Sequence, residues 1–467
     1  MSAPVPICLR TAALAPVVLL ALVALASPAN AVDGDGDPTF RGTGWFVADV
    51  PSLGGKAAAV TADGRLLIGY TAVLDGTDKD MRVMPVPDSG ITVHCASYHP
   101  DLGGTDDDRL ADIAVYGNSV FLAGRAAGPV SNLDNLAAFA AFDLSTCLLT
   151  ASFGGTSGVL LGSGVPLESV ALAIDGFGHP RTALQAGPAG ARALQMVGLS
   201  PTGDLDDSGL IDFSSAFGAT SFEPKGIALQ PDGKRIVVGT MVVAGGDRDI
   251  GVARLTSSGA LDTSFSIDGL AGFSYDIVDS GDDEALAVAV LPGGSIVVAG
   301  RVERALGFQA AVAILTPTGG FQNSFGLVGR YAFDFLAPNR LDTIRALVLQ
   351  GDGKMVVAGS TAPLPPLTDS DFALARLSIS GSQPLDASFG GGGTERVIFD
   401  QGGNLADAAY DLTLGQGGKI TVVGAVATDN GTAIAAARLK NSYIFADGFE
   451  WGNLLGSEWG GVWGGNE

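Results

Sequence analysis

The stretch Pro224–Thr240 reads PKGIALQPDGKRIVVGT and decides the fold. Two apolar runs, Ile227–Leu229 and Ile236–Val238, flank a turn that contains Asp232–Gly233. β-Branched residues favour strands, and Asp-Gly supplies the positive φ that a tight hairpin turn needs. Each run is apolar at successive positions instead of alternating, which requires a sheet that is buried on both faces. The stretch therefore predicts a hairpin inside a stack of packed sheets.

The same landmark returns along the chain. Leu110–Arg125 reads LADIAVYGNSVFLAGR and Ile344–Ser360 reads IRALVLQGDGKMVVAGS, so each copy has a strand, a Gly-containing turn and a second strand that ends near Gly. The closing glycines run from Gly69 to Gly424 at a spacing of about 59 residues. There are seven copies, which begin at Lys56, Leu110, Ser169, Pro224, Ala285, Ile344 and Ala408.

A second landmark follows the strand pair. Gly251–Phe265 (GVARLTSSGALDTSF) and Phe372–Gly390 (FALARLSISGSQPLDASFG) each contain a third strand, a polar turn and the motif Leu-Asp-x-Ser-Phe. A fourth strand then leads into the next copy, as in RYAFDF at Arg330–Phe335. Four strands per unit at a fixed period are typical of a β-propeller, with an open solenoid or β-helix as the alternative.

The two ends of the repeat region favour a closed ring. Asp37–Val50 (DPTFRGTGWFVADV) matches the end of the second landmark plus a fourth strand, whereas the last copy stops after a third strand at Ala433–Lys440. The strand that the last copy lacks is therefore present near the start of the chain, and a solenoid would need polar caps instead. We predict an all-β, seven-bladed β-propeller with four-stranded blades, in which the N-terminal strand closes the last blade.

These repeats resemble those of the delta-60 repeat proteins, whose units read LDxSFGxxG, a strand, ALxxQPDGKIVVAG and FALARL. The match is strongest at Ile227–Gly239, Ala346–Gly359 and Phe372–Gly390, and it extends over residues 37–440. The third copy departs most, with GFGHPRTALQ at Gly176–Gln185. The resemblance implies a secreted or surface-exposed bacterial propeller, and it implies no established activity and no catalytic residues.

The beginning of the chain has the layout of a signal peptide. A basic segment precedes the apolar run Thr11–Ala26, and Ala29 and Ala31 occupy the small-residue positions that a signal peptidase recognises. The run is shorter than the roughly 20 residues that span a bilayer. We expect residues 1–31 to be removed and residues 32–442 to form the propeller. The product would be secreted, held at the cell surface or periplasmic, with no transmembrane segment after cleavage.

The last segment, residues 443–467, differs in composition from the repeats. It reads YIFADGFEWGNLLGSEWGGVWGGNE and is rich in Gly and Trp. Its start, IFADGFEWGN, resembles a recurrent C-terminal tail of secreted bacterial proteins. A sorting or attachment signal, an aromatic segment that packs on the propeller and an unstructured end are the open alternatives.

The charge balance is strongly acidic. Asp and Glu number 49 against 26 Lys and Arg, which gives a formal net charge of −23. This sign disfavours nucleic acids and anionic membranes as partners. An apolar content of 47% is ample for a core, so the acidity is not that of a disordered chain.

Common catalytic and cofactor-binding motifs are absent from the sequence. There is no GxSxG nucleophile elbow, no HExxH zinc pair and no loop with the spacing of a phosphate-binding loop. Gly-Lys pairs recur at one repeat position, which is typical of turns. We therefore predict no catalytic and no cofactor-binding residues.

Acidic loops are the better candidates for holding an ion. Asp33, Asp35 and Asp37 alternate with glycines, which lets carboxylate oxygens converge on a hard cation such as Ca²⁺. Asp204–Ile211 resembles the start of an EF-hand loop, but Ser215 stands where the bidentate Glu is expected. The first group is the stronger calcium candidate, and solvated acidic loops are the alternative for both.

Two cysteines, Cys95 and Cys147, follow the signal segment. An exported chain meets an oxidising compartment, so the pair is a candidate disulfide between neighbouring blades. Two separate thiols are the alternative, because the geometry of the pair decides.

Some charged residues recur at fixed repeat positions. Arg254, Arg376 and Arg438 share one position, and Asp262 and Asp386 share another. A residue that returns in several blades serves the blade, so we predict Arg–Asp links of structural value instead of catalytic groups.

Three functional hypotheses follow from this pattern. The first is a secreted or surface-exposed, non-enzymatic binding propeller whose partner is an extracellular glycan or protein. The second is a glycan-active hydrolase or lyase with paired carboxylates in the axial funnel. The third is a structural cell-envelope protein. Propellers serve all three purposes, so the fold does not choose among them.

Overall fold

The computed structural model describes residues 34–441, except 76–77, 90–94, 96, 99–106, 128–134, 156–157, 163–164, 276–280, 368 and 403–405. The predicted signal segment, residues 1–31, and the predicted tail, residues 443–467, lie outside the described residues, and their assignments stay predictions. None of the helices in the described part of the chain is long and apolar enough to cross a membrane.

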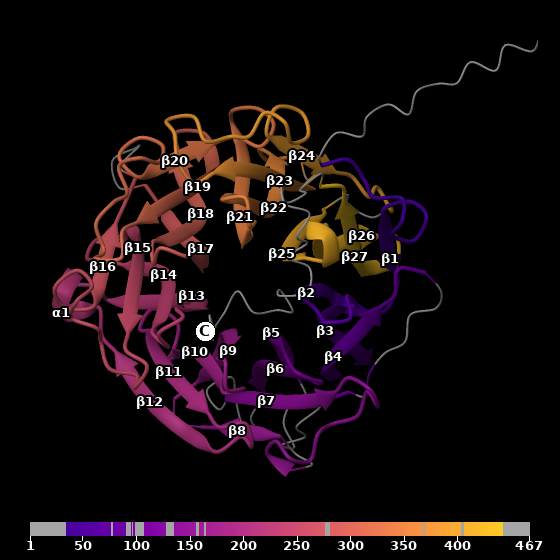
Figure 1. Ribbon diagram of the computed structural model, residues 1–467, viewed down its shortest axis with the longest axis horizontal. Helices are drawn as coiled ribbons and strands as arrows, with labels where there is room; N and C mark the ends of the chain where they lie inside the picture. The colour runs from indigo at the N-terminus through magenta and orange to yellow at the C-terminus, as the bar shows by residue number, and fades with distance from the viewer. Residues whose placement is uncertain are drawn as a thin grey trace, which may run out of the picture. The chain divides into compact units, whose positions relative to one another are not determined.

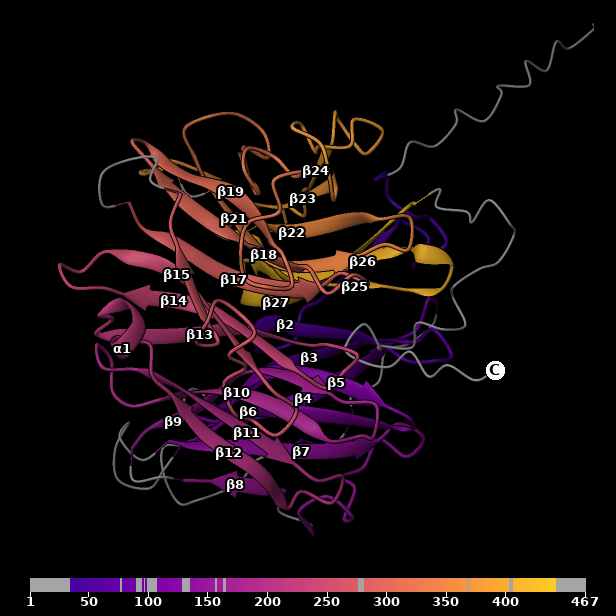
Figure 2. The ribbon, with the colours of Figure 1, turned by 60° about the vertical axis from the view of Figure 1, so that its left-hand side comes forward.

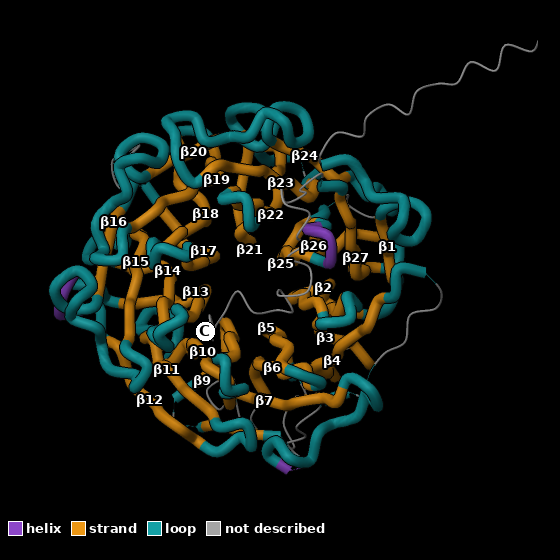
Figure 3. Tube along the Cα trace, viewed as in Figure 1, coloured by secondary structure: helices purple, strands orange, loops and turns teal. Residues whose placement is uncertain are grey.

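The protein consists of small β-sheets grouped around a central axis (Figure 1). In chain order the strands are β1 (Trp45–Ala48), β2 (Ser52–Val60), β3 (Leu66–Asp75), β4 (Asp78–Val86), β5 (Arg109–Tyr116), β6 (Ser119–Ala126), β7 (Leu136–Asp143), β8 (Val159–Leu161), β9 (Leu167–Ile174), β10 (Pro180–Ala186), β11 (Ala193–Leu199), β12 (Leu205–Ile211), β13 (Ser221–Leu229), β14 (Arg235–Val242), β15 (Arg248–Leu255), β16 (Leu270–Phe273), β17 (Asp283–Val290), β18 (Ile296–Arg304), β19 (Gly307–Leu315), β20 (Arg330–Phe333), β21 (Arg340–Leu349), β22 (Lys354–Pro363), β23 (Asp371–Ser378), β24 (Thr394–Val397), β25 (Ala408–Leu414), β26 (Ile420–Thr428) and β27 (Gly431–Leu439). Short helices, among them α1 (Ser214–Phe217) and η2 (Gln416–Gly418), interrupt the loops (Figure 3). The predicted all-β class is confirmed.

Consecutive strands pair antiparallel within each sheet. The sheets β5–β8, β9–β12 and β13–β16 each have four strands, as predicted. β17–β20 and β21–β24 are joined by one parallel pair, Phe308 with Leu341. The sheet β2–β4 has three strands in the described part of the chain, where an isolated bridge between Met81 and Tyr98 lies beside β4. Among the described residues of this segment, a second isolated bridge joins Lys79 of β4 to Asp107.

The first strand of each sheet lies nearest the axis and contacts the first strand of the next sheet. These contacts run from β2 through β5, β9, β13, β17 and β21 to β25, and β25 contacts β2. Sheet faces are packed against neighbouring sheets (Figure 2). Ile236, Val237 and Val238 of β14 have no exposed surface, and Val238 shares a core cluster with Val298 of β18. The prediction of sheets buried on both faces is confirmed.

The two ends of the described chain meet in one sheet. β1 pairs antiparallel with β27, with Phe46 opposite Ala436, and thereby completes the sheet of β25, β26 and β27. The Phe46 ring packs with Val423 and Ile434, and the Arg41 guanidinium lies 4.8 Å from the centre of that ring. The predicted pairing of the N-terminal strand with the last repeat is confirmed.

Phe46→Ala should loosen this junction. Phe46 is only 6% exposed, so its truncation removes apolar burial and leaves a cavity. We expect the free energy of unfolding to fall by about 3–5 kcal/mol in chemical denaturation. Phe177→Ala is the control, because Phe177 is 80% exposed and its loss should change stability by less than about 0.5 kcal/mol. Equal losses in the two variants would contradict the packing role of β1.

Candidate functional site

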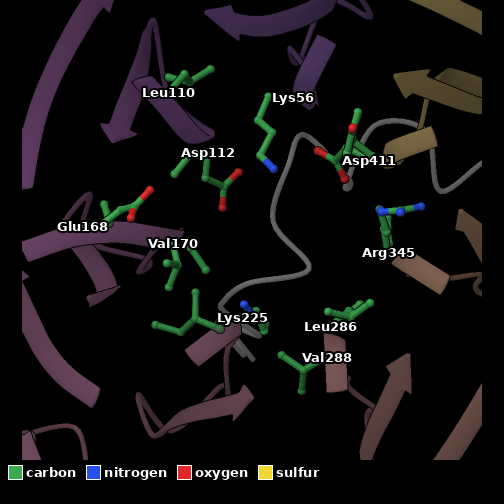
Figure 4. A pocket seen from close by; sticks show the side chains of 18 of the residues that line it. Lys56, Leu110, Asp112, Glu168, Val170, Lys225, Leu286, Val288, Arg345 and Asp411 are labelled. Atoms are coloured by element: carbon green, nitrogen blue, oxygen red, sulfur yellow. The ribbon is translucent and has the colours of Figure 1, made fainter. Parts of the chain in front are cut away.

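Every innermost strand carries a β-bulge at the same repeat position. A bulge leaves one residue unpaired and redirects its side chain. The seven bulged residues all line one cavity of about 740 Å³ at the axis (Figure 4). They are Lys56, Ala111, Val170, Lys225, Leu286, Arg345 and Tyr410. The position is thus structurally uniform and chemically varied, as a recognition surface requires.

The closing glycine of the landmark makes room for the bulge. Gly359 pairs with Ile344 beside bulged Arg345, and a Cβ on Gly359 would overlap the carbonyl oxygen of Thr343. Gly300 stands in the same relation to the carbonyl oxygen of Glu284. Close approach of two backbones is a recurrent reason for glycine inside a strand. The glycine that marks the repeat in the sequence therefore supports the cavity wall.

Two basic residues face the cavity beside an aromatic ring. The Lys56 ammonium lies 5.0 Å and the Arg345 guanidinium 5.4 Å from the centre of the Tyr410 ring. Arg345 also donates a hydrogen bond from Nη1 to Ser360 Oγ at 2.7 Å. Burial within the ring of sheets lowers the pKa of Lys56, and repulsion from Arg345 adds to this effect. Burial likewise lowers the pKa of Arg345.

Two carboxylates follow the bulge at equivalent positions of β5 and β25. Asp112 accepts a hydrogen bond from the Leu172 amide at 2.8 Å, and Asp411 accepts one from the Ala58 amide at 2.6 Å. Each bond reaches the next sheet, so these side chains hold neighbouring sheets together. Burial, with the charge of Asp411, raises the pKa of Asp112 to about 7. Burial raises the pKa of Asp411 to about 6.

Glu284 and Glu168 complete the acidic part of the lining. Glu284 is neutralised by Arg248 at 3.3 Å and by Arg301 at 3.1 Å. Glu168 lies across the cavity from Arg345 (Figure 4). Basic and acidic side chains thus alternate around the cavity.

A second, apolar section of about 260 Å³ is lined by residues further along the same inner strands. Ile227, Val288 and Leu347 line both sections, so the two adjoin at these residues. Every lining side chain of the second section is apolar except Thr413. The axis therefore changes from charged to apolar along the strands.

Asp35 and Asp37, the calcium candidates within the described residues, do not line this cavity. Asp33 is outside the described residues, and Asp35 is exposed. Asp37 is buried, forms a salt bridge with Lys419 at 3.0 Å and accepts a hydrogen bond from the Thr39 hydroxyl at 2.8 Å. No group of three or more metal-binding side chains is found among the described residues. The calcium site stays a prediction.

The Asp204–Ile211 segment largely coincides with β12, where two of its carboxylates already have partners. Asp206 contacts His179 at 2.6 Å, and Asp207 forms a salt bridge with Arg235 at 2.6 Å. These contacts serve the sheet instead of an ion.

The predicted Arg–Asp links are present in two repeats. Arg254 pairs with Asp262, and Arg376 pairs with Asp386, each at 2.8 Å. Although burial opposes it, the hydrogen bonds from Ser264 and the charge of Arg254 lower the pKa of Asp262 to about 2. The prediction is confirmed for these two arginines.

Arg438 differs from the other two arginines. It pairs with Asp88, while Asp37 takes the place of the repeat aspartate and binds Lys419. Asp37, Thr39 and Phe40 therefore take the place of the Asp-x-Ser-Phe motif in the last repeat, although they lie near the start of the sequence. The Arg438 guanidinium lies 4.4 Å from the centre of the Phe40 ring.

Cys95 and Cys147 are joined by a disulfide. Cys95 follows β4, and Cys147 lies in the turn after β7, so the bond connects two neighbouring sheets. Neither residue lines the axial cavity.

Lys56, Arg345, Tyr410, Asp112 and Asp411 were not among the residues proposed from the sequence. Their signal was visible, because one position of the otherwise uniform landmark changes from Lys to Val, Leu, Arg and Tyr between copies. A repeat whose other positions are uniform and whose one position varies is typical of a shared scaffold that carries a specific site.

Comparison with known proteins supports the propeller fold. A family model described as "Domain of unknown function (DUF5122) beta-propeller" matches residues 230–265 and 350–389. The chain is a β-propeller repeat protein. No curated protein sequence matches it.

Solved propellers of very different sequence are similar to this one. Polysaccharide lyase Uly1 matches with a TM-score of 0.50 at 10% identity, and the match covers 88% of this chain and 98% of the lyase chain. Drosophila Semaphorin 2a has a TM-score of 0.48 at 10% identity, covering 88% and 76%. The β-propeller domain of the Trilobed protease from Pyrococcus furiosus, described with an open velcro topology, has 0.42 at 7% identity, covering 86% and 99%. At these identities the first similarity shows the fold alone.

Gly359→Ala should destabilise the cavity wall. The new methyl group has no space beside the Thr343 carbonyl, so the strands must shift, and we expect a loss of about 1–3 kcal/mol in the free energy of unfolding. Gly293→Ala is the matched control, since nothing lies within 4 Å of a Cβ there. Denaturant titration of both variants measures the difference, and a neutral Gly359→Ala would disprove the steric argument.

Asp112 should make stability depend on pH near neutrality. Its pKa rises from 3.8 to about 7 on folding, so its contribution is complete below pH 4 and is lost as the pH rises through 7. We expect the melting temperature of the wild type to fall relative to that of Asp112→Asn between pH 5 and 8. The slope should not exceed about 1.4 kcal/mol per pH unit.

Asp143→Asn controls for the loss of a carboxylate. The hydrogen bond from Ser145 lowers the pKa of Asp143 to about 2, below the tested range. The difference in melting temperature between Asp143→Asn and the wild type should therefore stay constant between pH 5 and 8. Parallel curves for Asp112→Asn would show that Asp112 is ionised throughout.

Proposed function

We propose that this chain is an exported, non-enzymatic binding protein, a seven-bladed propeller of the delta-60 repeat type that holds its ligand in the axial cavity. Seven inner strands in successive contact support the blade count. The repeat pattern over residues 37–440 supports the family. An extracellular glycan or protein is the partner class that we propose.

The observation that carries this proposal is the chemistry of the bulge position. One scaffold position presents Lys56, Lys225, Leu286, Arg345 and Tyr410 to a common cavity. Unlike side chains at equivalent positions around an axis provide specificity for one ligand.

The hydrogen bonds of Asp112 and Asp411 favour binding over turnover. Asp112 and Asp411 each accept two backbone amide hydrogen bonds, one from the following residue and one from the next sheet. A general acid or base must be free to reach the substrate. No histidine lines the cavity within the described residues.

Export and the domain limits are part of the proposal. The signal-like segment 1–31 supports export, and a disulfide between Cys95 and Cys147 suits an oxidising compartment. We propose residues 32–442 as the propeller and residues 443–467 as a sorting or attachment segment. Calcium bound near Asp33, Asp35 and Asp37 is a further proposal, which a thermal melt with Ca²⁺ and with chelator tests.

A glycan-active enzyme is the second candidate. Its support is the pair Asp112 and Asp411, whose pKa values are raised to about 7 and about 6 inside one cavity. A carboxylic acid with a raised pKa beside a second carboxylate is the arrangement that glycoside hydrolysis uses.

Leu286→Trp distinguishes a ligand site in the axial cavity from a ligand site elsewhere on the protein. Leu286 projects into the cavity, so a larger ring should block any ligand there, whatever its charge. We expect at least one compound from a panel of oligosaccharides and small carboxylates to raise the melting temperature of the wild type. It should act equally on the control Leu306→Trp, which changes a 57% exposed residue, and should not act on Leu286→Trp.

The fate of the bound compound decides between binding and catalysis. Mass spectrometry after prolonged incubation should recover it unchanged. Recovery of cleaved sugars would favour the enzyme. Binding that survives in Leu286→Trp would place the site outside the axial cavity and refute the proposal.

A further inference from the structure

Five charged side chains of the axial cavity form no salt bridge with any described residue. They are Arg345, Asp411, Lys56, Asp112 and Glu168. The other charged side chains of the lining each form a salt bridge, so their charges are already neutralised. The five unpaired groups, which we call the alternating arc, therefore set the electrostatic character of the cavity.

The charges of the alternating arc change sign from strand to strand. The inner strands β21, β25, β2, β5 and β9 contact one another in this order, and they carry Arg345, Asp411, Lys56, Asp112 and Glu168 in turn. Burial raises the pKa of Asp112 to about 7, so this carboxyl is only partly ionised at neutral pH. Neither sign is therefore in clear excess, and the arc favours neither an anionic nor a cationic ligand.

The groups of the alternating arc keep hydrogen-bonding capacity for a ligand. Each carboxylate oxygen of Asp112 and Asp411 accepts one backbone amide, which leaves it one further lone pair. Arg345 uses one of its five N–H donors on Ser360. The side chains of Lys56 and Glu168 form no hydrogen bond with any described residue.

Hydroxyl groups match this alternation. A hydroxyl can accept a hydrogen bond from a cation and donate one to a carboxylate at the same time. Along an arc in which cations and carboxylates alternate, one ligand hydroxyl can therefore bridge the side chains of two neighbouring strands. A ligand with several hydroxyl groups can bond to the whole arc without carrying a charge.

The wall across the cavity from Lys56 contributes apolar side chains. β13 and β17 lie opposite β2 in the ring of inner strands and supply Ile227, Leu286 and Val288 to the lining (Figure 4). A sugar ring carries hydroxyl groups at its rim and C–H groups on its faces, so it can contact both walls. The cavity volume of about 740 Å³ suits a ligand of drug size, such as a trisaccharide.

We propose that the axial cavity binds an uncharged oligosaccharide, whose hydroxyl groups bridge the alternating arc and whose C–H faces contact Leu286 and Val288. This inference rests on the proposed binding function and names the class of ligand for the same cavity.

Calorimetric titration with four neutral trisaccharides tests the proposal. Maltotriose, cellotriose, β-1,4-galactotriose and chitotriose are the probes, and at least one should bind. Anionic trigalacturonate and cationic, fully deacetylated chitotriose should both bind at least about tenfold more weakly, because each is repelled by one sign of the arc. The affinity for the neutral sugar should change by less than about twofold between about 50 and 500 mM NaCl, since salt screens only interactions between charges.

Arg345→Gln and Glu168→Gln remove opposite charges and therefore test the sign of the ligand. A neutral sugar should bind about threefold to tenfold more weakly to both variants, because hydrogen bonds to charged groups are the stronger ones. A charged ligand would respond to the two changes in opposite directions. Arg65→Gln is the control, because it removes a positive charge from an exposed ion pair with Asp63 and should leave the affinity unchanged.

Three results would overturn the inference. They are no binding of any of the four neutral trisaccharides, tighter binding of either charged trisaccharide, and opposite effects of Arg345→Gln and Glu168→Gln. If a charged trisaccharide binds and its binding is lost in Leu286→Trp, the proposed function stands and only the ligand class is wrong. If neither the neutral nor the charged compounds bind, the proposed function fails as well.

Discussion

The structure depends on backbone pairing between the two ends of the chain. β1 supplies the outer strand of the sheet that β25, β26 and β27 begin, and Asp411 of β25 accepts the Ala58 amide of β2. Without these bonds the first and last sheets would each present an unprotected face or edge. Every other inter-sheet contact resembles contacts elsewhere in the ring, whereas this one joins residues from opposite ends of the sequence. It is the constraint that makes a succession of similar sheets into one cooperative body.

The site is a by-product of how the inner strands pair. A bulge at one repeat position turns a side chain toward the axis, and the closing glycine leaves room for the backbone that bulges. Neighbouring positions of the scaffold and the cavity therefore differ in how well they tolerate a change of side chain. The carbonyl of Thr343 leaves no room for a side chain at Gly359. Arg345 follows Ile344, the residue that pairs with Gly359, and its bulge position carries different side chains in different repeats. Repeats built in this way can change what they bind and keep how they fold.

Sequence reasoning reached the fold because its signals are local. Runs such as Ile236–Val238 and the Asp-Gly turns predict the hairpins, and the unmatched strand near Trp45 predicts the pairing with β27. The variable landmark position is only an indirect signal of the cavity residues, because a bulge is a property of the register between two strands. The apolar run of β21 does not reveal that Arg345 is unpaired. The sequence makes Asp37 a candidate calcium ligand and does not reveal its salt bridge, because Lys419 lies almost 400 residues further along the chain. The disulfide candidate, by contrast, needed only two cysteines and the prediction of export.

The sheet shared by both ends has a consequence for how the protein matures. Synthesis delivers a chain from its N-terminus onward, so β1 has no pairing partner until Gly431–Leu439 has been made. Until then the apolar side chains around Phe46 have nothing to pack against, and the sheets already formed remain an open arc. A chain interrupted before β27 keeps that arc open and presents its core to proteases. The pairing of β1 with β27 thus makes resistance to proteolysis depend on synthesis of the chain as far as β27.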